Sequence, residues 1–216
     1  MRSAIVLLSG GLDSATTLYY AKHQGFSVHA LIFDYGQRHG KEIKCAVAVA
    51  KAARCPYEIV KISLPWKGSA LLDRKIKVPH HRRLDAKDIP VTYVPARNII
   101  FLSFAASYAE AIGAQKIFIG ANAIDYSGYP DCRPDFFSAY AKVLAKGLKT
   151  GVEGHKIKVE TPLIRLTKAQ IIRLGMKLKV PYGLTWSCYA GGRRPCGQCD
   201  SCRLRAKGFE EVASRK

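Results

Sequence analysis

The stretch RSAIVLLSGGLDSATTLYYAKHQG, residues 2–25, decides the fold class of this chain. Residues 2–8 form a short, β-prone apolar run that stops at a glycine turn. From Ser14 onward, apolar residues recur at helical spacing until Gly25 provides a helix stop. The segment therefore predicts a strand, a loop and a helix, in that order.

The same alternation continues through the rest of the chain. Apolar runs predict strands at 27–34, 57–64, 116–120 and 156–160. Amphipathic or apolar runs predict helices at 41–54, 98–113, 136–149 and 167–178, the last with Thr167 as its N-cap. Because each right-handed crossover must bury its apolar stripe on the sheet, this order predicts an α/β fold with a doubly wound parallel sheet.

Length and composition suit one globular domain. The chain has 216 residues, of which 48% are hydrophobic and 24% are charged, so it can build a core of its own. The apolar run from Ala4 to Leu8 is far too short to span a bilayer, and no small-residue cleavage site follows it. We therefore expect neither a membrane segment nor a signal peptide.

The chain is strongly basic. Lys and Arg number 35 against 16 Asp and Glu, which gives a net charge of +19. Such a charge attracts phosphate-bearing ligands or nucleic acid but does not specify a fold. Many of these cations fall in residues 67–87, which predict a long basic loop. Two interpretations of this loop stay open, a lid over a site and a solvated surface excursion.

The glycine loop at the end of the first predicted strand is a candidate phosphate site. In a doubly wound sheet, ligands bind at the carboxyl ends of the strands, and Ser9-Gly10-Gly11-Leu12-Asp13-Ser14 lies there. Glycines let backbone N–H groups approach a phosphate, serines add hydroxyl donors, and the following helix offers its positive end. The loop has neither the lysine of a P-loop nor the GxGxxG spacing of a dinucleotide fold. Asp13 could instead simply cap the helix.

Four cysteines near the C-terminus have metal-ligand spacing. Cys188, Cys196, Cys199 and Cys202 form a C-x7-C-x2-C-x2-C pattern. A closed site of four thiolates around Zn²⁺ would be structural, fastening the tail to the domain. An iron–sulfur cluster is the open alternative, because cluster proteins use similar spacing. This use of cysteine predicts a reducing, cytoplasmic location.

Several segments together resemble known families. SGGLDS resembles the pyrophosphate loop of the ATP pyrophosphatase superfamily, whose members adenylate their substrates. The segments DYGQRH at 34–39, VPARN at 94–98, DYSGYPDCR at 125–133 and TWSCY at 185–189, running into the cysteine tail, are similar to the 7-cyano-7-deazaguanine synthase family. The similarity covers nearly the whole chain. It departs at Ala96, where the family commonly has glycine, and in the basic loop.

The resemblance implies an enzyme, an ATP-dependent carbon–nitrogen ligase of queuosine and archaeosine biosynthesis. Its substrates would be 7-carboxy-7-deazaguanine and ammonia, and its product the nitrile, formed through an acyl adenylate and an amide. The implied fold is of the adenine nucleotide α-hydrolase type, with a nucleotide-binding unit at 1–182 and a zinc-binding tail at 183–216 in one compact body. Implied cofactors are ATP, Mg²⁺ and one structural Zn²⁺. We also expect a homodimer, since soluble oligomers are most often twofold.

The resemblance, together with the chemistry and position of the residues themselves, suggests which residues fill these roles. ATP would contact the loop and the helix start, namely Leu8, Ser9, Gly10, Gly11, Leu12, Asp13, Ser14, Ala15, Thr16, Thr17 and Leu18. Asp13, as a Mg²⁺ ligand, and Lys168, as a phosphate-neutralising cation, would be catalytic. The substrate would contact Arg97, Asp125, Tyr126, Ser127, Asp131 and Arg133, and the metal Cys188, Cys196, Cys199 and Cys202.

Each assignment has a simpler structural alternative. Arg97 could pair with a nearby acid, Lys168 could be a surface lysine, and residues 125–133 could be a surface turn. His39 could act as a general base, although a single histidine after a strand is more often structural.

Two other functions compete with the ligase. One is a tRNA-modifying adenylating enzyme, which the charge favours and the motifs do not. The other is a non-catalytic zinc-ribbon module for nucleic acid, which leaves SGGLDS unexplained. We therefore expect small-molecule substrates and no specific nucleic-acid partner.

Overall fold

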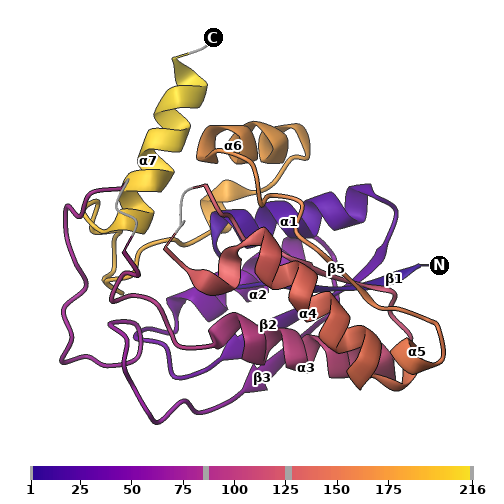
Figure 1. Cartoon of the computed structure of the whole chain (residues 1–216). Coiled ribbons are helices and arrows are strands. Elements are labelled where there is room, and N and C mark those ends of the chain that lie inside the picture. Colours follow the sequence, from indigo (N-terminus) through magenta and orange to yellow (C-terminus); the bar gives the residue numbers. More distant parts are fainter. Residues whose placement is uncertain (1, 85–87, 125–127, 215–216) are drawn as a thin grey trace.

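The computed structural model describes residues 2–84, 88–124 and 128–214. Its centre is a parallel sheet of five strands in the order β3-β2-β1-β4-β5 (Figure 1). The strands are β1 (Ser3–Leu7), β2 (Ser27–Asp34), β3 (Tyr57–Lys61), β4 (Lys116–Ile119) and β5 (Lys158–Glu160). The α/β fold class predicted from the alternation of strands and helices is confirmed.

Helices cover both faces of the sheet. The α-helices are α1 (Leu12–His23), α2 (Lys41–Ala52), α3 (Arg97–Ala111), α4 (Pro134–Gly147), α5 (Lys149–Val152), α6 (Lys168–Lys177) and α7 (Asp200–Ala213), and the 3-10 helices are η1 (Pro130–Cys132) and η2 (Tyr182–Leu184). Ala4 and Val6 of β1 point to a core with α1 and α2, whereas Ile5 and Leu7 point to a core with α3 and α4. The side-chain alternation of a strand thus builds both layers. Apolar residues on both faces explain why the strand signals were continuous rather than alternating.

The predicted elements agree with the structure to within a few residues, and two α-helices were missed, the short α5 and the longer α7. Thr167 caps α6 as expected, accepting from the backbone N–H of Gln170 in a complete capping box. Helix α7 was not predicted, because the glycines and prolines around the cysteines indicated irregular structure. It begins directly after Cys199 and packs on α6, where Phe209 and Val212 contact a small apolar cluster.

The basic segment is held against the body of the protein as far as residue 84. Ser69, Ala70 and Leu71 are buried. Arg82 lies 3.7 Å from the Asp200 carboxylate, and Arg203 of α7 donates to the Arg82 carbonyl at 2.6 Å. These contacts tie the segment to the cysteine tail. Within the described residues, no helix has the length and apolar character needed to cross a membrane.

Candidate active site

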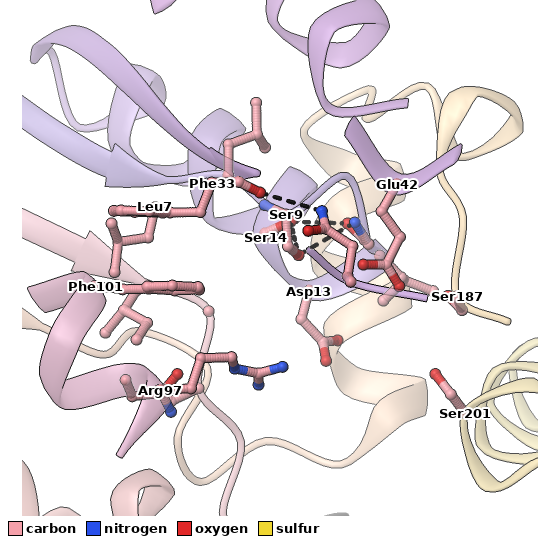
Figure 2. Close-up of a pocket in the computed structure, with 18 of the residues that line it drawn as sticks. Leu7, Ser9, Asp13, Ser14, Phe33, Glu42, Arg97, Phe101, Ser187 and Ser201 are labelled. Atoms are coloured by element: carbon pink, nitrogen blue, oxygen red, sulfur yellow. Dashed lines mark hydrogen bonds between the residues drawn. The ribbon is translucent and has the colours of Figure 1, made fainter. Parts of the chain in front are cut away.

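A pocket opens at the carboxyl ends of the central strands, where a doubly wound sheet places its ligands (Figure 2). The ends of β1, β2 and β4 line it, as do the starts of α1, α2 and α3 and part of the C-terminal tail. The described lining residues with hydroxyl, amide or charged side chains are Ser9, Asp13, Ser14, Tyr35, Gln37, Glu42, Arg97, Asn98, Asn122, Tyr129, Lys168, Ser187, Tyr189, Ser201 and Arg205.

The glycine loop is closed by its own serines. Ser9 Oγ donates to Ser14 Oγ at 3.0 Å, and Ser14 Oγ also accepts from the Ser9 backbone N–H at 3.2 Å. The N-cap of α1 is Gly11, and no side chain caps this helix. The first-turn N–H groups of α1 are therefore open to an anion in the pocket.

Gly10 allows the loop to lie directly on α2. Its φ is +80°, and a Cβ at this position would lie 2.4 Å from the Glu42 carbonyl oxygen and 2.6 Å from the Ala46 nitrogen. Any other residue would push the loop away from α2. The Gly10 carbonyl accepts from the Trp186 N–H at 2.9 Å, which fixes the loop to the C-terminal tail as well.

Asp13 and Lys168, both predicted as catalytic, lie together. Lys168 Nζ is 2.8 Å from each oxygen of the Asp13 carboxylate. Lys168 is only 8% exposed, so this cation is not a surface lysine. A paired, hydrogen-bonded arrangement is what allows a buried charge. The pair brings the start of α6 against the start of α1 at the pocket wall.

Arg97 points into the pocket from the start of α3, as Figure 2 shows. Ala96 before it has φ +55°, the left-handed conformation that glycine adopts easily, which settles the backbone angle at this position. The Arg97 guanidinium donates to the Tyr35 hydroxyl at 3.5 Å. It forms no ion pair with any acid among residues 2–84, 88–124 and 128–214.

An aromatic wall lies beside Arg97. The rings of Phe33 and Phe101 stack with centroids 4.0 Å apart and planes 4° from parallel. Both rings line the pocket, and the Tyr35 ring meets Phe101 edge-on. This wall offers a flat apolar surface to a planar heterocycle.

Two of the other predicted substrate residues, Asp131 and Arg133, do not line the pocket. Asp131 is 4% exposed, and its carboxylate accepts from the Asn98 backbone N–H at 3.1 Å, so it supports the start of α3 rather than lining the pocket. Burial raises the pKa of Asp131. Arg133 is exposed at the N-cap of α4 and does not line the pocket. Asp125, Tyr126 and Ser127 lie outside the described residues.

The four predicted metal ligands converge. The Sγ atoms of Cys188, Cys196, Cys199 and Cys202 all lie within 4.8 Å of one another. Backbone N–H groups donate to two of these sulfurs: Cys196 N–H lies 3.3 Å from Cys188 Sγ, and Cys199 N–H lies 3.3 Å from Cys196 Sγ. Desolvation opposes ionisation of Cys196, but hydrogen bonds to its sulfur, led by those from the backbone N–H groups of Cys199 and Gln198, outweigh it and lower the pKa of Cys196 to about 7. The donor set suits a metal that prefers thiolates.

His39 belongs to this part of the structure and not to the pocket lining. Its Nε2 lies 3.0 Å from the Cys188 carbonyl oxygen, and its ring packs beside Gly191, where a Cβ would come within 2.6 Å. Burial lowers the pKa of His39. These contacts favour the structural interpretation of this histidine.

Comparison with known proteins places the chain. The family model for the queuosine biosynthesis protein QueC matches residues 3–213. A 7-cyano-7-deazaguanine synthase from Nostoc punctiforme is 56% identical over 213 residues, covering 97% of this chain and 95% of the relative. A protein of the same name from Thermoplasma volcanium is 55% identical, covering 98% and 88%. The chain belongs to the 7-cyano-7-deazaguanine synthase family. The resemblance of its motifs is thereby confirmed, as is membership of a family of ligases.

Solved structures share the fold of this family member at low sequence identity. An NMN synthetase from Francisella tularensis has a TM-score of 0.52 at 14% identity, covering 100% of this chain and 87% of that one. A predicted subunit of a tRNA methyltransferase from Methanocaldococcus jannaschii has a TM-score of 0.50 at 14% identity, covering 82% and 75%. These similarities concern the fold alone.

Only some of the residues that were predicted to bind ATP line the pocket. Leu8, Ser9, Gly11, Leu12, Asp13 and Ser14 line it. Gly10 instead packs on α2, and Ala15, Thr16, Thr17 and Leu18 are buried deeper in α1 without lining the pocket. Thr16, for example, donates to the Leu12 carbonyl at 2.9 Å. The side chains of these deeper residues shape the helix and its core contacts.

Several lining groups were given no role in the sequence analysis, among them Glu42, Ser187 and Arg205. Glu42 was part of an ordinary amphipathic helix pattern, Ser187 stood within a motif without an assigned role, and Arg205 belongs to α7, which was missed. Arg205 donates to the hydroxyl of Ser187 at 3.2 Å and to that of Thr185 at 2.7 Å. The family motif around Ser187 was a signal that could have identified this residue. For Glu42 the sequence held no signal beyond its position shortly after the DYGQRH segment.

Proposed function

We propose that this chain is an ATP-dependent carbon–nitrogen ligase that converts 7-carboxy-7-deazaguanine and ammonia to 7-cyano-7-deazaguanine. Relatives named for that product support the proposal across nearly the whole chain. The observation that carries it is the pocket, in which the Ser9–Ser14 loop and the Arg97 guanidinium share one cavity. A site for phosphates therefore adjoins a site for a carboxylate.

The proposed chemistry begins with activation of a poor electrophile. The substrate carboxylate attacks the α-phosphate of ATP, and pyrophosphate leaves. Ammonia then displaces AMP from the acyl adenylate to give the amide. A second activation, at the amide oxygen, followed by loss of AMP, yields the nitrile. In this scheme the loop acts electrostatically, with its N–H groups and hydroxyls stabilising the charge that grows on the leaving pyrophosphate.

The pocket residues have distinct roles in this scheme. Arg97 holds the substrate carboxylate or a phosphate, and the Phe33–Phe101 wall takes a flat ring. Lys168 fixes Asp13 and neutralises negative charge nearby. The proposed contacts of Asp125, Tyr126 and Ser127 with the substrate remain part of this scheme.

Mg²⁺ fits beside Asp13. The carboxylate faces the pocket with 22% of its side chain exposed, and after accepting from Lys168 it retains lone pairs for a hard cation. Asp13 would hold the ion, which would supply charge neutralisation for the phosphates.

Zinc is the proposed metal of the cysteine cluster. A tetrahedral zinc–thiolate site with bonds of about 2.3 Å places its sulfurs about 3.8 Å apart. The Sγ atoms here lie within 4.8 Å of one another, which suits a single ion better than a larger iron–sulfur cluster. Cys188, Cys196, Cys199 and Cys202 would hold it. None of the four lines the pocket, so the role is structural.

The test is turnover of ATP with 7-carboxy-7-deazaguanine and ammonium. AMP and the nitrile are followed by mass spectrometry, and the metal content of the same preparation is measured. AMP with nitrile, and one zinc per chain, is the expected result. No turnover with this acid, but AMP release on adding tRNA, would favour the tRNA-modifying alternative. We also propose a homodimer in the cytoplasm, and light scattering measures the assembly.

A further inference from the structure

Glu42 places an acidic side chain in the pocket. It lies in the first turn of α2, and Figure 2 shows it and Arg97 reaching into the cavity from different sides. Asp13 and Glu42 are the acidic residues in the described lining. Asp13 is already engaged, with both carboxylate oxygens 2.8 Å from the Lys168 ammonium.

The Glu42 carboxylate, by contrast, has no hydrogen bond or ion pair within the described ranges 2–84, 88–124 and 128–214. The titratable or charged groups that face it are Arg97 of α3, Tyr35 after β2 and Cys45 of its own helix. Desolvation raises the pKa of Glu42 to about 7, and the Arg97 charge limits the rise. A carboxyl group at this value can both accept and release a proton near neutral pH.

The proposed reaction must remove protons from nitrogen. Attack of ammonia on the acyl adenylate forms a C–N bond and leaves a positive charge on that nitrogen. A proton must depart before the C–O bond to AMP breaks and the neutral amide forms. In the second half, both N–H protons of the amide are lost. The first leaves when adenylation of the amide oxygen gives the neutral imidate, and the second leaves as AMP departs with the C–O electron pair and the C≡N bond forms. Each half therefore needs an acceptor in the pocket.

Resting on the proposed function, we propose that Glu42 is the catalytic base that accepts the protons lost by the nitrogen, one in the first half of the reaction and two in the second. Its carboxylate becomes a carboxylic acid when the nitrogen is deprotonated, and it returns the proton to solvent between steps. The other candidates fit this role less well. Asp13 is held by Lys168, and His39 packs against the Cys188 carbonyl rather than in the pocket.

The experiment compares Glu42→Gln with the wild-type protein in two assays. Exchange of labelled pyrophosphate into ATP, with the acid present and ammonia absent, reports adenylation alone. Nitrile formation at a constant concentration of free ammonia reports the whole reaction. We expect Glu42→Gln to form nitrile at least about 100-fold more slowly, with exchange reduced far less. Glu42→Asp should retain more activity than Glu42→Gln, and Glu210→Gln, on the exposed side of α7, is the matched control.

Two further readouts separate a base from a merely structural residue. The wild-type rate of nitrile formation should rise with pH through about 7, and this limb should vanish in Glu42→Gln. Hydroxylamine, whose adduct loses its proton to water easily, should rescue hydroxamate formation in Glu42→Gln. Full nitrile formation by Glu42→Gln, or an equal loss of pyrophosphate exchange and nitrile, would overturn the assignment. A wild-type protein that makes no AMP with the acid overturns the proposed function and this inference with it.

Discussion

Replacing Glu42 with glutamine should change the pH dependence of stability in the ligand-free protein. The pKa of Glu42 is raised from 4.5 to about 7 by desolvation. Below pH 4.5 the carboxyl is protonated in both the folded and the unfolded chain and has no effect on the pH dependence. Between pH 4.5 and 7 the unfolded chain loses this proton while the folded one keeps it. Stability therefore falls as pH rises, and the full penalty is present above pH 7.

The magnitude follows from the two pKa values. A shift from 4.5 to about 7 corresponds to about 3 kcal/mol once both states are ionised. Integrated between pH 5 and pH 8, the penalty grows by about 2.5 kcal/mol. Glutamine is neutral and nearly the same size, so it resembles the protonated glutamate. The unfolding free energy of the variant, relative to that of the wild type, should therefore rise by about 2.5 kcal/mol between pH 5 and pH 8.

Urea denaturation of both proteins at pH 5, 6, 7 and 8 measures this difference. Taking the difference between the variants removes the pH effects that both share, including those of the cysteine cluster. In thermal melts the same gain corresponds to about 5 to 10 °C for a chain of this size. Glu210→Gln should give a small offset that does not vary with pH. An equally flat offset for Glu42→Gln would show that its carboxyl titrates normally, and the argument from desolvation would fail.

Three other perturbations test the packing around the site. In Gly10→Ala the added Cβ meets the backbone of α2, and urea denaturation should show a loss of about 3 kcal/mol in unfolding free energy. The control Gly25→Ala also has a positive φ, +79°, but its Cβ meets open space, so it should lose only about 1 kcal/mol; equal losses would mean that the loop can move off α2. Asp13→Asn removes the carboxylate paired with Lys168 and should lower the unfolding free energy by about 3 kcal/mol. Adding Lys168→Met should restore at least half of this loss, and a double variant less stable than Asp13→Asn would contradict this account of the pair. Cys202→Ser should lower three quantities together: the zinc content, the unfolding free energy, by more than about 3 kcal/mol, and the rate of nitrile formation. Full activity without metal would show that the tail does not shape the pocket.

Local patterns were sufficient for most of the fold. Strands β1, β2 and β4 are buried apolar runs between glycine or polar turns, and the helices between them carry apolar stripes, so each element signalled its own type. Helix α7 gave no such signal. The glycines and prolines before it indicated irregular structure, and it is stabilised by packing Phe209 and Val212 on α6, a contact between segments that local periodicity does not encode.

The residues of the candidate site also differ in whether local sequence could reveal them. The glycine loop and the cysteines were predictable, because their chemistry depends on residues close together in sequence. Glu42 was not, because Lys41-Glu42-Ile43 looks like the solvated start of a helix. Its desolvation arises from distant segments, since Arg97, Trp186 and Ser187 line the same cavity. The desolvation of a charged side chain depends on the tertiary structure, so the neighbouring sequence does not reveal the free energy that it costs.

The net charge of +19 supported phosphate binding at the level of composition, but the pocket accounts for little of it. Arg97, Lys168 and Arg205 are the cations in the described lining, against Asp13 and Glu42, which leaves one positive charge in excess when all are ionised. Because Lys168 is paired with Asp13, the groups that we propose for recognising anions are Arg97, Arg205 and the uncapped start of α1. A few placed donors in a partly desolvated pocket act more strongly than many solvated charges. The other basic residues that the structure describes lie outside the pocket lining, so they do not contact a ligand held there.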